Sequence, residues 1–228
     1  MNRPEGYPKI SVIICTFNEE QNLPHVLPKV TEWVDEVLLV DGHSTDRTVE
    51  VAKKLRPDIR ILYQSGKGKG DAIKYGIQQA IGDIIVTLDA DGSTDPEEMP
   101  KFIKPLLDGY DFTKGSRLAD GRPPSMLWHR WFGNKVLAIT SNIFYGTRYT
   151  DICSGYNAFW KSAFQRLRLT YGGFEMEQEM AVKAKKAGLK VVEVNHHYAG
   201  RLGGSSKVSD IKQGLFNWIV IIKECFRG

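Results

Sequence analysis

The chain has 228 residues, 42% of them hydrophobic and 25% charged, a composition ordinary for a globular protein. That length allows one substantial core, and no Ser/Pro/Gly-rich linker divides it, so we expect a single domain over residues 1–228. Three scattered cysteines without a CxxC pair argue against a disulfide framework, and no apolar run reaches the roughly 18–20 residues that cross a bilayer.

Charge is distributed unevenly along the chain. Residues 1–110 carry 13 Lys/Arg against 18 Asp/Glu, whereas residues 111–228 carry 18 against 9. The basic back half suggests an anionic partner such as phosphates or a membrane surface, and a solvated basic face is the alternative. The N-terminus lacks the apolar core of a signal peptide, which predicts a cytoplasmic protein.

The front half alternates apolar runs with helical patterns. The runs predicted as strands are 10–16, 36–41, 59–63 and 83–89. The segments predicted as helices are about 18–33, 47–55 and 70–82, with a fourth starting at Asp95-Pro96. Near-continuous apolar strands between helices predict an α/β fold with a mostly parallel sheet covered on both faces.

The back half is less regular. The segments predicted as strands are 111–117, 155–160 and 190–197, and those predicted as helices are about 128–145, 174–188 and 208–226. For Glu175 and Glu179, four residues apart on one predicted helix, we expect solvent exposure.

Polar residues follow three of the front strands. They are Thr16 to Glu19, then Asp41, then Asp89-Ala90-Asp91. Ligands of such sheets bind beyond the carboxyl ends of the strands, so these clusters are expected to face one crevice.

The "DAD" segment allows more than one chemistry. Asp89 and Asp91 are hard oxygen ligands that suit Mg²⁺ or Mn²⁺ together with substrate phosphates. A turn that merely caps the next helix is one alternative. Another is the DxDG[ST] element of haloacid-dehalogenase-type phosphatases, which however ends the first strand of the sheet and is followed by an acidic metal pair that this chain lacks.

A Gly-rich loop precedes the helix predicted at 70–82. The letters "SGKGKGDA" do not have the spacing of a GxxxxGK[ST] phosphate loop. Lys67 and Lys69 lie on this loop ahead of the helix N-terminus and could still touch a nucleotide, and a plain surface loop is the alternative.

Six motifs together resemble glycosyltransferase family 2, in particular the dolichyl- or polyprenyl-phosphate sugar synthases. They are "SVIICTFNEEQNLPHVL", "VDGHSTDRTVEVA", "GKGKGDAIKYGIQQAIGDIIVTLDADGS", "KGSR", "DICSGYNAFW" and "RLGGSSK". The resemblance covers residues 9–210 and implies a GT-A fold, Rossmann-like. Residues 9–110 would be its nucleotide-sugar half and residues 111–228 its acceptor half.

The resemblance also implies the donor site. An NDP-sugar of the GDP-mannose or UDP-glucose type would lie across the sheet edge, with Mg²⁺ or Mn²⁺ held by Asp89 and Asp91 as cofactor. The residues implied to contact the nucleotide sugar are Thr16, Asn18, Glu19, Asp41, Lys69, Asp89, Ala90 and Asp91. Ser93 stands where relatives often carry Gln, Asn or His, so water could complete the metal shell.

The acceptor implied by the resemblance is a polyprenyl phosphate, with no nucleic acid involved. The cations implied to bind its phosphate are Arg117, Arg130, Arg201 and Lys207, and the catalytic set is Asp91, Arg117 and Glu177. Many hydroxyl-directed relatives carry an "ED" base motif where this chain has "GFEMEQEM". That departure favours a phosphate acceptor, although Glu177 or Asp151 could serve as a base or position an arginine. A hydroxyl acceptor and non-catalytic sugar-nucleotide binding stay as alternatives.

Aromatic residues in the segment "MLWHRWFGNKVLAITSNIFYG" bear on the acceptor too. Trp128, Trp131 and Phe132 beside His129 and Arg130 resemble an interfacial belt, or else ordinary core aromatics. Peripheral contact with the cytoplasmic membrane face is therefore expected, and the oligomeric state stays open.

Overall fold

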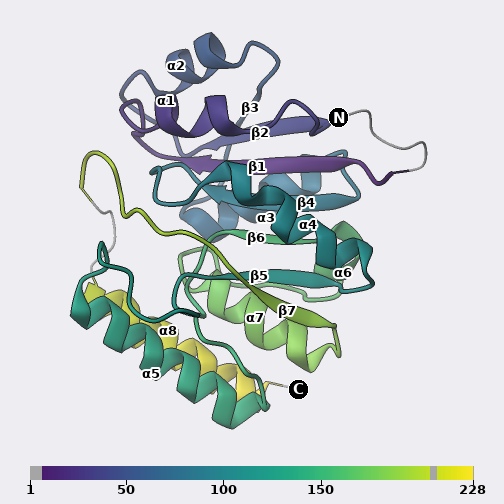
Figure 1. Cartoon of the computed structure of the whole chain (residues 1–228), viewed down its shortest axis with the longest axis vertical. Helices are drawn as coiled ribbons and strands as arrows, with labels where there is room; N and C mark the ends of the chain where they lie inside the picture. Colours follow the sequence, from purple (N-terminus) through teal and green to yellow (C-terminus); the bar gives the residue numbers. More distant parts are fainter. Residues whose placement is uncertain (1–6, 206–209, 228) are drawn as a thin grey trace.

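A computed structural model describes residues 7–205 and 210–227. Within this part of the chain, seven strands form one mixed sheet in the order β3-β2-β1-β4-β6-β5-β7 (Figure 1). The strands are β1 (Ile10–Thr16), β2 (Glu36–Asp41), β3 (Arg60–Tyr63), β4 (Ile84–Asp89), β5 (Phe112–Ser116), β6 (Asn157–Trp160) and β7 (Val191–Asn195). The first four pair in parallel as predicted, and β6 runs antiparallel between β4 and β5.

Helices cover the sheet. They are α1 (Leu23–Val26), α2 (Thr48–Leu55), α3 (Lys69–Gln79), α4 (Met99–Leu107), α5 (Trp128–Tyr145), α6 (Lys161–Gln165), α7 (Met176–Lys186) and α8 (Asp210–Phe226), with the 3-10 turns η1 (Leu27–Lys29) and η2 (Pro96–Glu98). Asp95 caps η2 by accepting a hydrogen bond from the Glu97 N–H, as the Asp95-Pro96 pair predicts. None of the helices in the described ranges is both long and apolar enough to span a membrane.

The helix predicted over about 18–33 is wrong in extent. Asn18 has a left-handed backbone with φ of 57°, so the helix cannot begin there. It begins at Leu23 and gives way to η1, where Pro28 lacks the N–H that an α-helix would use. The residues between β1 and α1 are therefore a loop at the sheet edge.

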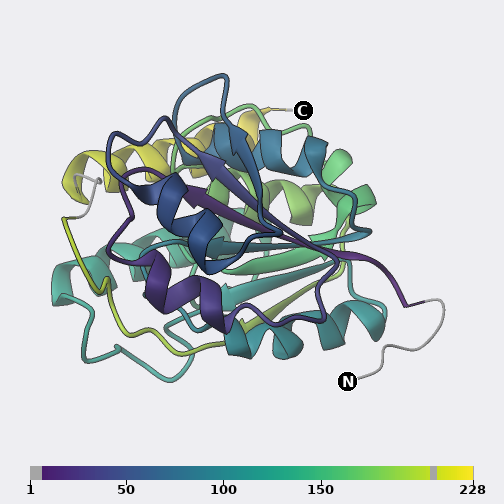
Figure 2. The same cartoon turned by 90° about the horizontal axis from the view of Figure 1, so that it is seen from above.

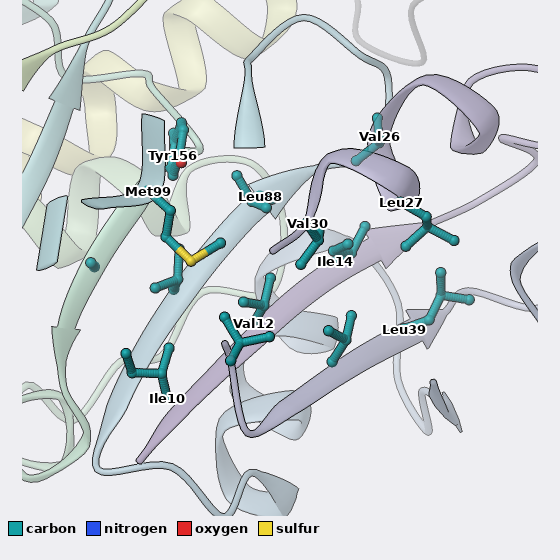
Figure 3. Close-up of a cluster of buried hydrophobic side chains, with 14 of the residues drawn as sticks. Ile10, Val12, Ile14, Val26, Leu27, Val30, Leu39, Leu88, Met99 and Tyr156 are labelled. Carbon is teal, nitrogen blue, oxygen red and sulfur yellow. The ribbon is translucent and has the colours of Figure 1, made fainter. Parts of the chain in front are cut away.

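Apolar side chains alternate across β1 and fill both faces of the sheet. Ile10, Val12 and Ile14 pack on one face with residues of α1 and α4 (Figure 3). Ile13 points to the other face, where α3 and α7 supply the partners. Burial on both faces explains why the strands read as continuous apolar runs.

The pair α5 and α8 forms a further layer beyond α7. These two helices lie side by side (Figures 1 and 2). Leu137 of α5 and Ile221 of α8 are buried against Val182 of α7. The opposite faces of α5 and α8 leave many large apolar side chains exposed.

The register of the strands aligns the carboxyl ends of β1, β2 and β4. Thr16 pairs with Asp41, and Cys15 pairs with Asp89. The carboxyl ends of β1, β2 and β4 therefore meet at a single edge of the sheet, as expected from the sequence.

Candidate active site

Asp41 organises the loops that follow β1 and β2. Its side chain is completely buried, and Oδ2 accepts hydrogen bonds from Thr16 Oγ1 at 3.0 Å and Ser44 Oγ at 2.6 Å. Oδ1 accepts from the Ser44 N–H at 2.8 Å. Because both oxygens are used within the chain, Asp41 shapes the loop that a nucleotide would touch. Its direct contact with a base or ribose stays a prediction.

Asn18 and Glu19 join that loop to distant parts of the chain. Asn18 Oδ1 accepts from the Thr45 N–H at 2.8 Å, which holds the loops after β1 and β2 together. The Glu19 carboxylate, 7% exposed, accepts from Arg201 NH2 at 2.7 and 2.8 Å and from Asn22 Nδ2 at 2.6 Å. Glu19 thus fixes the segment that follows β7 against the β1 edge.

That segment runs beside the end of β4. The Leu202 N–H donates to the Asp91 carbonyl at 3.1 Å, and the Ala199 N–H donates to the Ser93 carbonyl at 2.9 Å. The hydrogen bonds place the Arg201 guanidinium 3.8 Å from Asp91 Oδ2. Arg201 and Asp91, 110 positions apart, therefore share one site.

The two aspartates differ in their surroundings. Asp91 Oδ1 accepts from the Ser93 N–H at 3.0 Å, and its side chain is 26% exposed. Asp89 Oδ1 accepts from Lys69 Nζ at 2.5 Å. Ala90 between them is buried in the core, and Ser93 is only 3% exposed. The two side chains are equally exposed, 27% for Asp89 and 26% for Asp91, but Asp89 pairs with a lysine while Asp91 has a backbone N–H and a more distant arginine.

Lys69 bridges Asp89 and Glu177. Its Nζ lies 2.5 Å from Glu177 Oε1 as well as from Asp89. Burial opposes the charged ammonium, but the two carboxylates outweigh burial and raise the pKa of Lys69. Burial also raises the pKa of Glu177, although Lys69 opposes this. A Cβ at Gly155 would meet Lys69 Nζ at 2.4 Å and Asp89 Oδ2 at 2.5 Å, so only glycine leaves room for the bridge.

The carboxylates of Asp89 and Asp91 fit a magnesium or manganese ion whose coordination is completed by substrate phosphates and water. Among the described residues there is no group of three or more His, Cys, Asp or Glu side chains that could hold a metal by itself. Mg²⁺ is commonly held by one or two carboxylates together with substrate phosphates and water. Asp89 and Asp91 supply two such carboxylates at the end of one strand.

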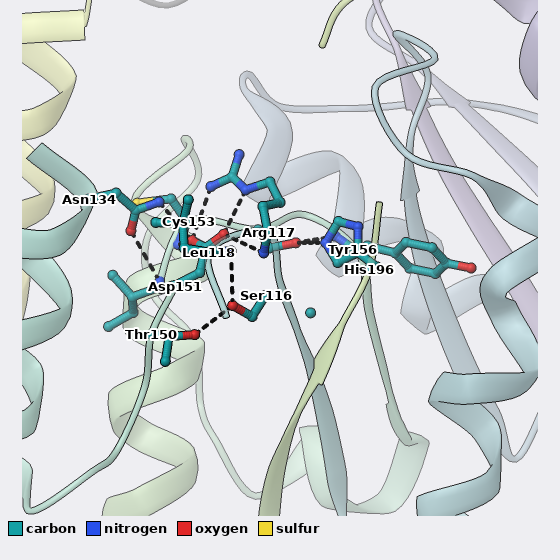
Figure 4. Close-up of polar contacts among 12 residues, drawn as sticks. Ser116, Arg117, Leu118, Asn134, Thr150, Asp151, Cys153, Tyr156 and His196 are labelled. Carbon is teal, nitrogen blue, oxygen red and sulfur yellow. Dashed lines mark hydrogen bonds and ion pairs between the residues drawn. The ribbon is translucent and has the colours of Figure 1, made fainter. Parts of the chain in front are cut away.

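Arg117 lies in a different setting. Its Nε and NH2 donate to Asp151 Oδ2 and Oδ1 at 2.6 and 3.0 Å, and Asn134 Nδ2 donates to the same Oδ1 at 2.7 Å (Figure 4). Asp151 is completely buried. Burial alone would raise the pKa of Asp151, but Arg117 holds it well below its ordinary value. Arg117 also stacks over the Tyr198 ring, with Cζ 5.3 Å from the centroid.

The predicted phosphate-binding cations line two different cavities. One, of about 200 Å³, is lined by Asp91, Arg130, Tyr198 and Arg201 among others. The second, of about 400 Å³, is lined by Arg117 and His196, and Tyr198 contributes to both. Arg130 and Arg201 therefore share a cavity with Asp91, whereas Arg117 opens to the neighbouring one. Lys207 lies outside the described residues.

Several features of the site could not be recognised in the sequence. The expected exposure of Glu175 and Glu179 is wrong, because both are buried. Glu179 accepts hydrogen bonds from the Thr170 and Tyr171 N–H groups, so it orders the loop before α7. The Lys69–Glu177 pair joins residues 108 positions apart, and the only signal for it was a lysine beside glycines at the start of a helix.

Solved structures share the fold. A glucosyl-3-phosphoglycerate synthase from Mycobacterium tuberculosis, in complex with Mn²⁺, UDP-glucose and phosphoglyceric acid, superposes with a TM-score of 0.75 at 20% identity. The match covers 98% of this chain and 82% of that one. The same synthase in complex with Mg²⁺ and UDP superposes with a TM-score of 0.73 at 21% identity, covering 98% and 82% of the two chains. This likeness establishes a GT-A fold.

Relatives found by sequence similarity are also glycosyltransferases. Glycosyltransferase AglJ of Haloferax volcanii is 34% identical over 211 residues, which are 90% of this chain and 68% of that protein. Dolichol-phosphate mannosyltransferase of Pyrococcus furiosus is 31% identical over 88% of this chain but only 59% of its own length. A dolichyl-phosphate hexose transferase of Haloferax volcanii is 28% identical over 95% of this chain and 93% of its own length.

The family model described as "Glycosyl transferase family 2" matches residues 11–168, more than half of the chain. This match and the place of Asp89 at the end of β4, the fourth strand along the chain, exclude the phosphatase alternative. The chain belongs to glycosyl transferase family 2, and it is a glycosyltransferase.

Proposed function

We propose that the protein transfers a hexose from a nucleotide diphosphate sugar to a polyprenyl phosphate, with inversion at the sugar C1 and with Mg²⁺ or Mn²⁺ as cofactor. The observation that carries this proposal is the cavity in which Asp91 meets two arginines, Arg130 and Arg201. One carboxylate from the donor side and two cations in one cavity suit a reaction in which a phosphate attacks a sugar diphosphate.

On the donor side, Asp89 and Asp91 would hold the metal ion. When bound, the ion would neutralise the charge that builds up on the leaving diphosphate. Thr16, Asn18 and Asp41 lie along the same edge and would face the nucleoside. UDP in the structural neighbours and dolichyl phosphate in the relatives' names support this class of donor and acceptor.

On the acceptor side, the arginines supply charge and position. In the proposed step a phosphate oxygen of the acceptor forms a bond to C1 while the bond from C1 to the diphosphate oxygen breaks, which releases the nucleoside diphosphate. A phosphate acceptor is already an anion at neutral pH, so it needs no base. Glu177 is held by Lys69, and we assign it a role in positioning that lysine.

The surface next to the cavity supports a lipid acceptor. Leu127, at the rim of the cavity, and Trp128 are 57% and 67% exposed. From there an exposed apolar stripe continues along α5 and α8. Its members are Phe132, Val136, Ile139, Ile143, Leu215 and Trp218. An apolar stripe of this extent is typical of a surface that docks on a membrane, and it would bring the cavity to the lipid headgroups.

A transfer assay tests the acceptor. Radiolabelled UDP-glucose and GDP-mannose would be offered with dolichyl phosphate, with dolichol, with 3-phosphoglycerate or with no acceptor, each with Mn²⁺, Mg²⁺ or EDTA. We expect label in the organic phase only with dolichyl phosphate and a metal ion. Dolichol is the matched control because it differs only in the phosphate. Label that enters only a water-soluble product would refute the lipid acceptor.

A hydroxyl acceptor is the second candidate, because Lys69 joins Glu177 to Asp89 and burial raises the pKa of Glu177, as that of a general base often is. The variant Glu177→Gln separates the two. With a phosphate acceptor we expect turnover within about tenfold of the parent, since no proton has to be removed. With a hydroxyl acceptor the base would be indispensable, and turnover would be abolished.

A further inference from the structure

Each aspartate of the "DAD" segment is paired with a cation from another part of the chain. Lys69, the first residue of α3, lies 2.5 Å from Asp89 Oδ1. Arg201, from the segment after β7, lies 3.8 Å from Asp91 Oδ2. A metal ion that bound the two aspartates would have to compete with both cations.

Each cation also has a second, buried carboxylate partner. Glu177, 6% exposed, holds Lys69 at 2.5 Å, and Glu19, 7% exposed, holds Arg201 at 2.7 Å. A cation that leaves its aspartate therefore keeps a partner and stays beside the site. The four carboxylates and two cations together leave two negative charges, which equals the charge that one divalent metal ion neutralises.

We infer that Lys69 and Arg201 are exchangeable counter-ions that couple metal binding to nucleotide binding. The inference rests on the proposed function. The diphosphate of the nucleotide attracts the two cations, which lowers their hold on Asp89 and Asp91 and makes those oxygens available to the metal ion. Without nucleotide, a metal ion that binds Asp89 leaves Lys69 with Glu177 as its one remaining carboxylate partner, whereas a bound diphosphate replaces the contact that Lys69 loses. Metal and nucleotide therefore bind with positive cooperativity, and linkage requires the effect to be equal in both directions.

The coupling is measured by titrating the protein with Mn²⁺ while free Mn²⁺ is followed by electron paramagnetic resonance, with and without saturating UDP or GDP. For the parent we expect nucleotide to tighten Mn²⁺ binding about tenfold or more, within the usual range of such couplings. In Lys69→Met we expect Mn²⁺ alone to bind more tightly than in the parent and the enhancement by nucleotide to fall to a few-fold. No turnover is needed for this readout.

Two further variants keep the test decisive. Lys69→Met leaves Asp89 and Glu177 without a cation between them, so Lys69→Met combined with Glu177→Gln restores the charge balance and should show the same loss of coupling. Lys74→Met removes the same charge further along α3 and should couple as the parent does. Circular dichroism and thermal unfolding establish that each variant is folded.

The outcomes distinguish the inference from the function on which it rests. If the parent binds UDP or GDP with Mn²⁺ but both Lys69 variants keep its full coupling, the inference is wrong and the proposed function stands. If Mn²⁺ and nucleotide bind the parent independently, the inference is also wrong. If the parent binds neither nucleotide with any metal, the proposed function fails, and the inference fails with it.

Discussion

Two arginine–carboxylate pairs lie close to the same edge of the sheet, and they differ in how completely they are satisfied. Asp151 is fully buried and receives both donors of the Arg117 fork together with the Asn134 amide. Asp91 has a side chain that is 26% exposed, one backbone hydrogen bond, and Arg201 at 3.8 Å. The first pair has the properties of a structural support, and the second belongs to the site at which we propose that substrate binds.

This difference indicates which of the two arginines would contact the substrate. Bidentate pairing in a buried place fixes a guanidinium and leaves little of its charge for a ligand. Arg201 makes its short contacts with Glu19 through NH2 alone, and it lines the same cavity as Asp91. We therefore give Arg201 and Arg130 the contacts with substrate phosphate, and Arg117 the task of holding β5 to the segment before β6.

The largest effect is expected for Asp151→Asn. Removing one partner of a buried pair leaves an uncompensated charge, here that of Arg117, and such changes cost about 3–5 kcal/mol of stability. Urea unfolding of the variant and the parent at neutral pH measures the loss. A variant that kept its stability but lost turnover would show that Arg117 and Asp151 belong to the active site and are not a structural support.

Asp91→Asn should reduce turnover rather than stability. We expect turnover to fall about 100-fold or more, a loss typical for removal of one group that stabilises developing charge. Stability should hardly change, because the side chain is partly exposed and carries few contacts. Asp108→Asn, at an exposed position after α4, is the matched control. Full activity in Asp91→Asn would refute the metal assignment.

The acid sensitivity of the protein should follow the buried pair. The pKa of Asp151 is lowered in the folded state, so its contribution to stability is complete above the unfolded pKa of about 3.9 and is lost as pH falls below it. The stability gap between the parent and Asp151→Asn should therefore be constant from pH 7 to about 5 and should shrink below about 4. Urea unfolding across this range tests the sign. A gap that widened on acidification would contradict it.

The front half of the sheet could be predicted because its signals are local. Apolar runs and turn residues gave β1 to β4 in order, and the rule for strand ends then brought Thr16, Asp41 and Asp89 to one edge. The exception was Asn18, whose left-handed backbone delays the helix to Leu23. Asparagine tolerates several backbone conformations, so the sequence does not predict which one Asn18 adopts in the loop.

The contacts of the cations could not be predicted in this way. Lys69 meets Glu177 only because α7 packs on the same face of the sheet as α3. Spacing on a predicted helix suggested that Glu179 is exposed. It is instead buried under a loop, and its carboxylate accepts hydrogen bonds from the N–H groups of that loop. Such pairings depend on tertiary packing, which a single sequence does not specify. The resemblance to a family supplied Arg201, and it could not rank Arg201 above Arg117.

Replacing each arginine by lysine should have milder effects, and these two variants separate the role of Arg117 from that of Arg201. Lysine keeps the charge but cannot reproduce a bidentate fork. At Arg117 the loss of one charged hydrogen bond to Asp151 should cost about 1.5–3 kcal/mol of stability with kcat unchanged. At Arg201 the charge matters more than the fork, so we expect unchanged stability and a KM for the donor or the acceptor that rises only a few-fold. Unfolding curves measure the stability of both variants, and steady-state kinetics measure their kcat and KM. If Arg117→Lys changed KM while Arg201→Lys changed stability, the roles of the two arginines would have to be exchanged.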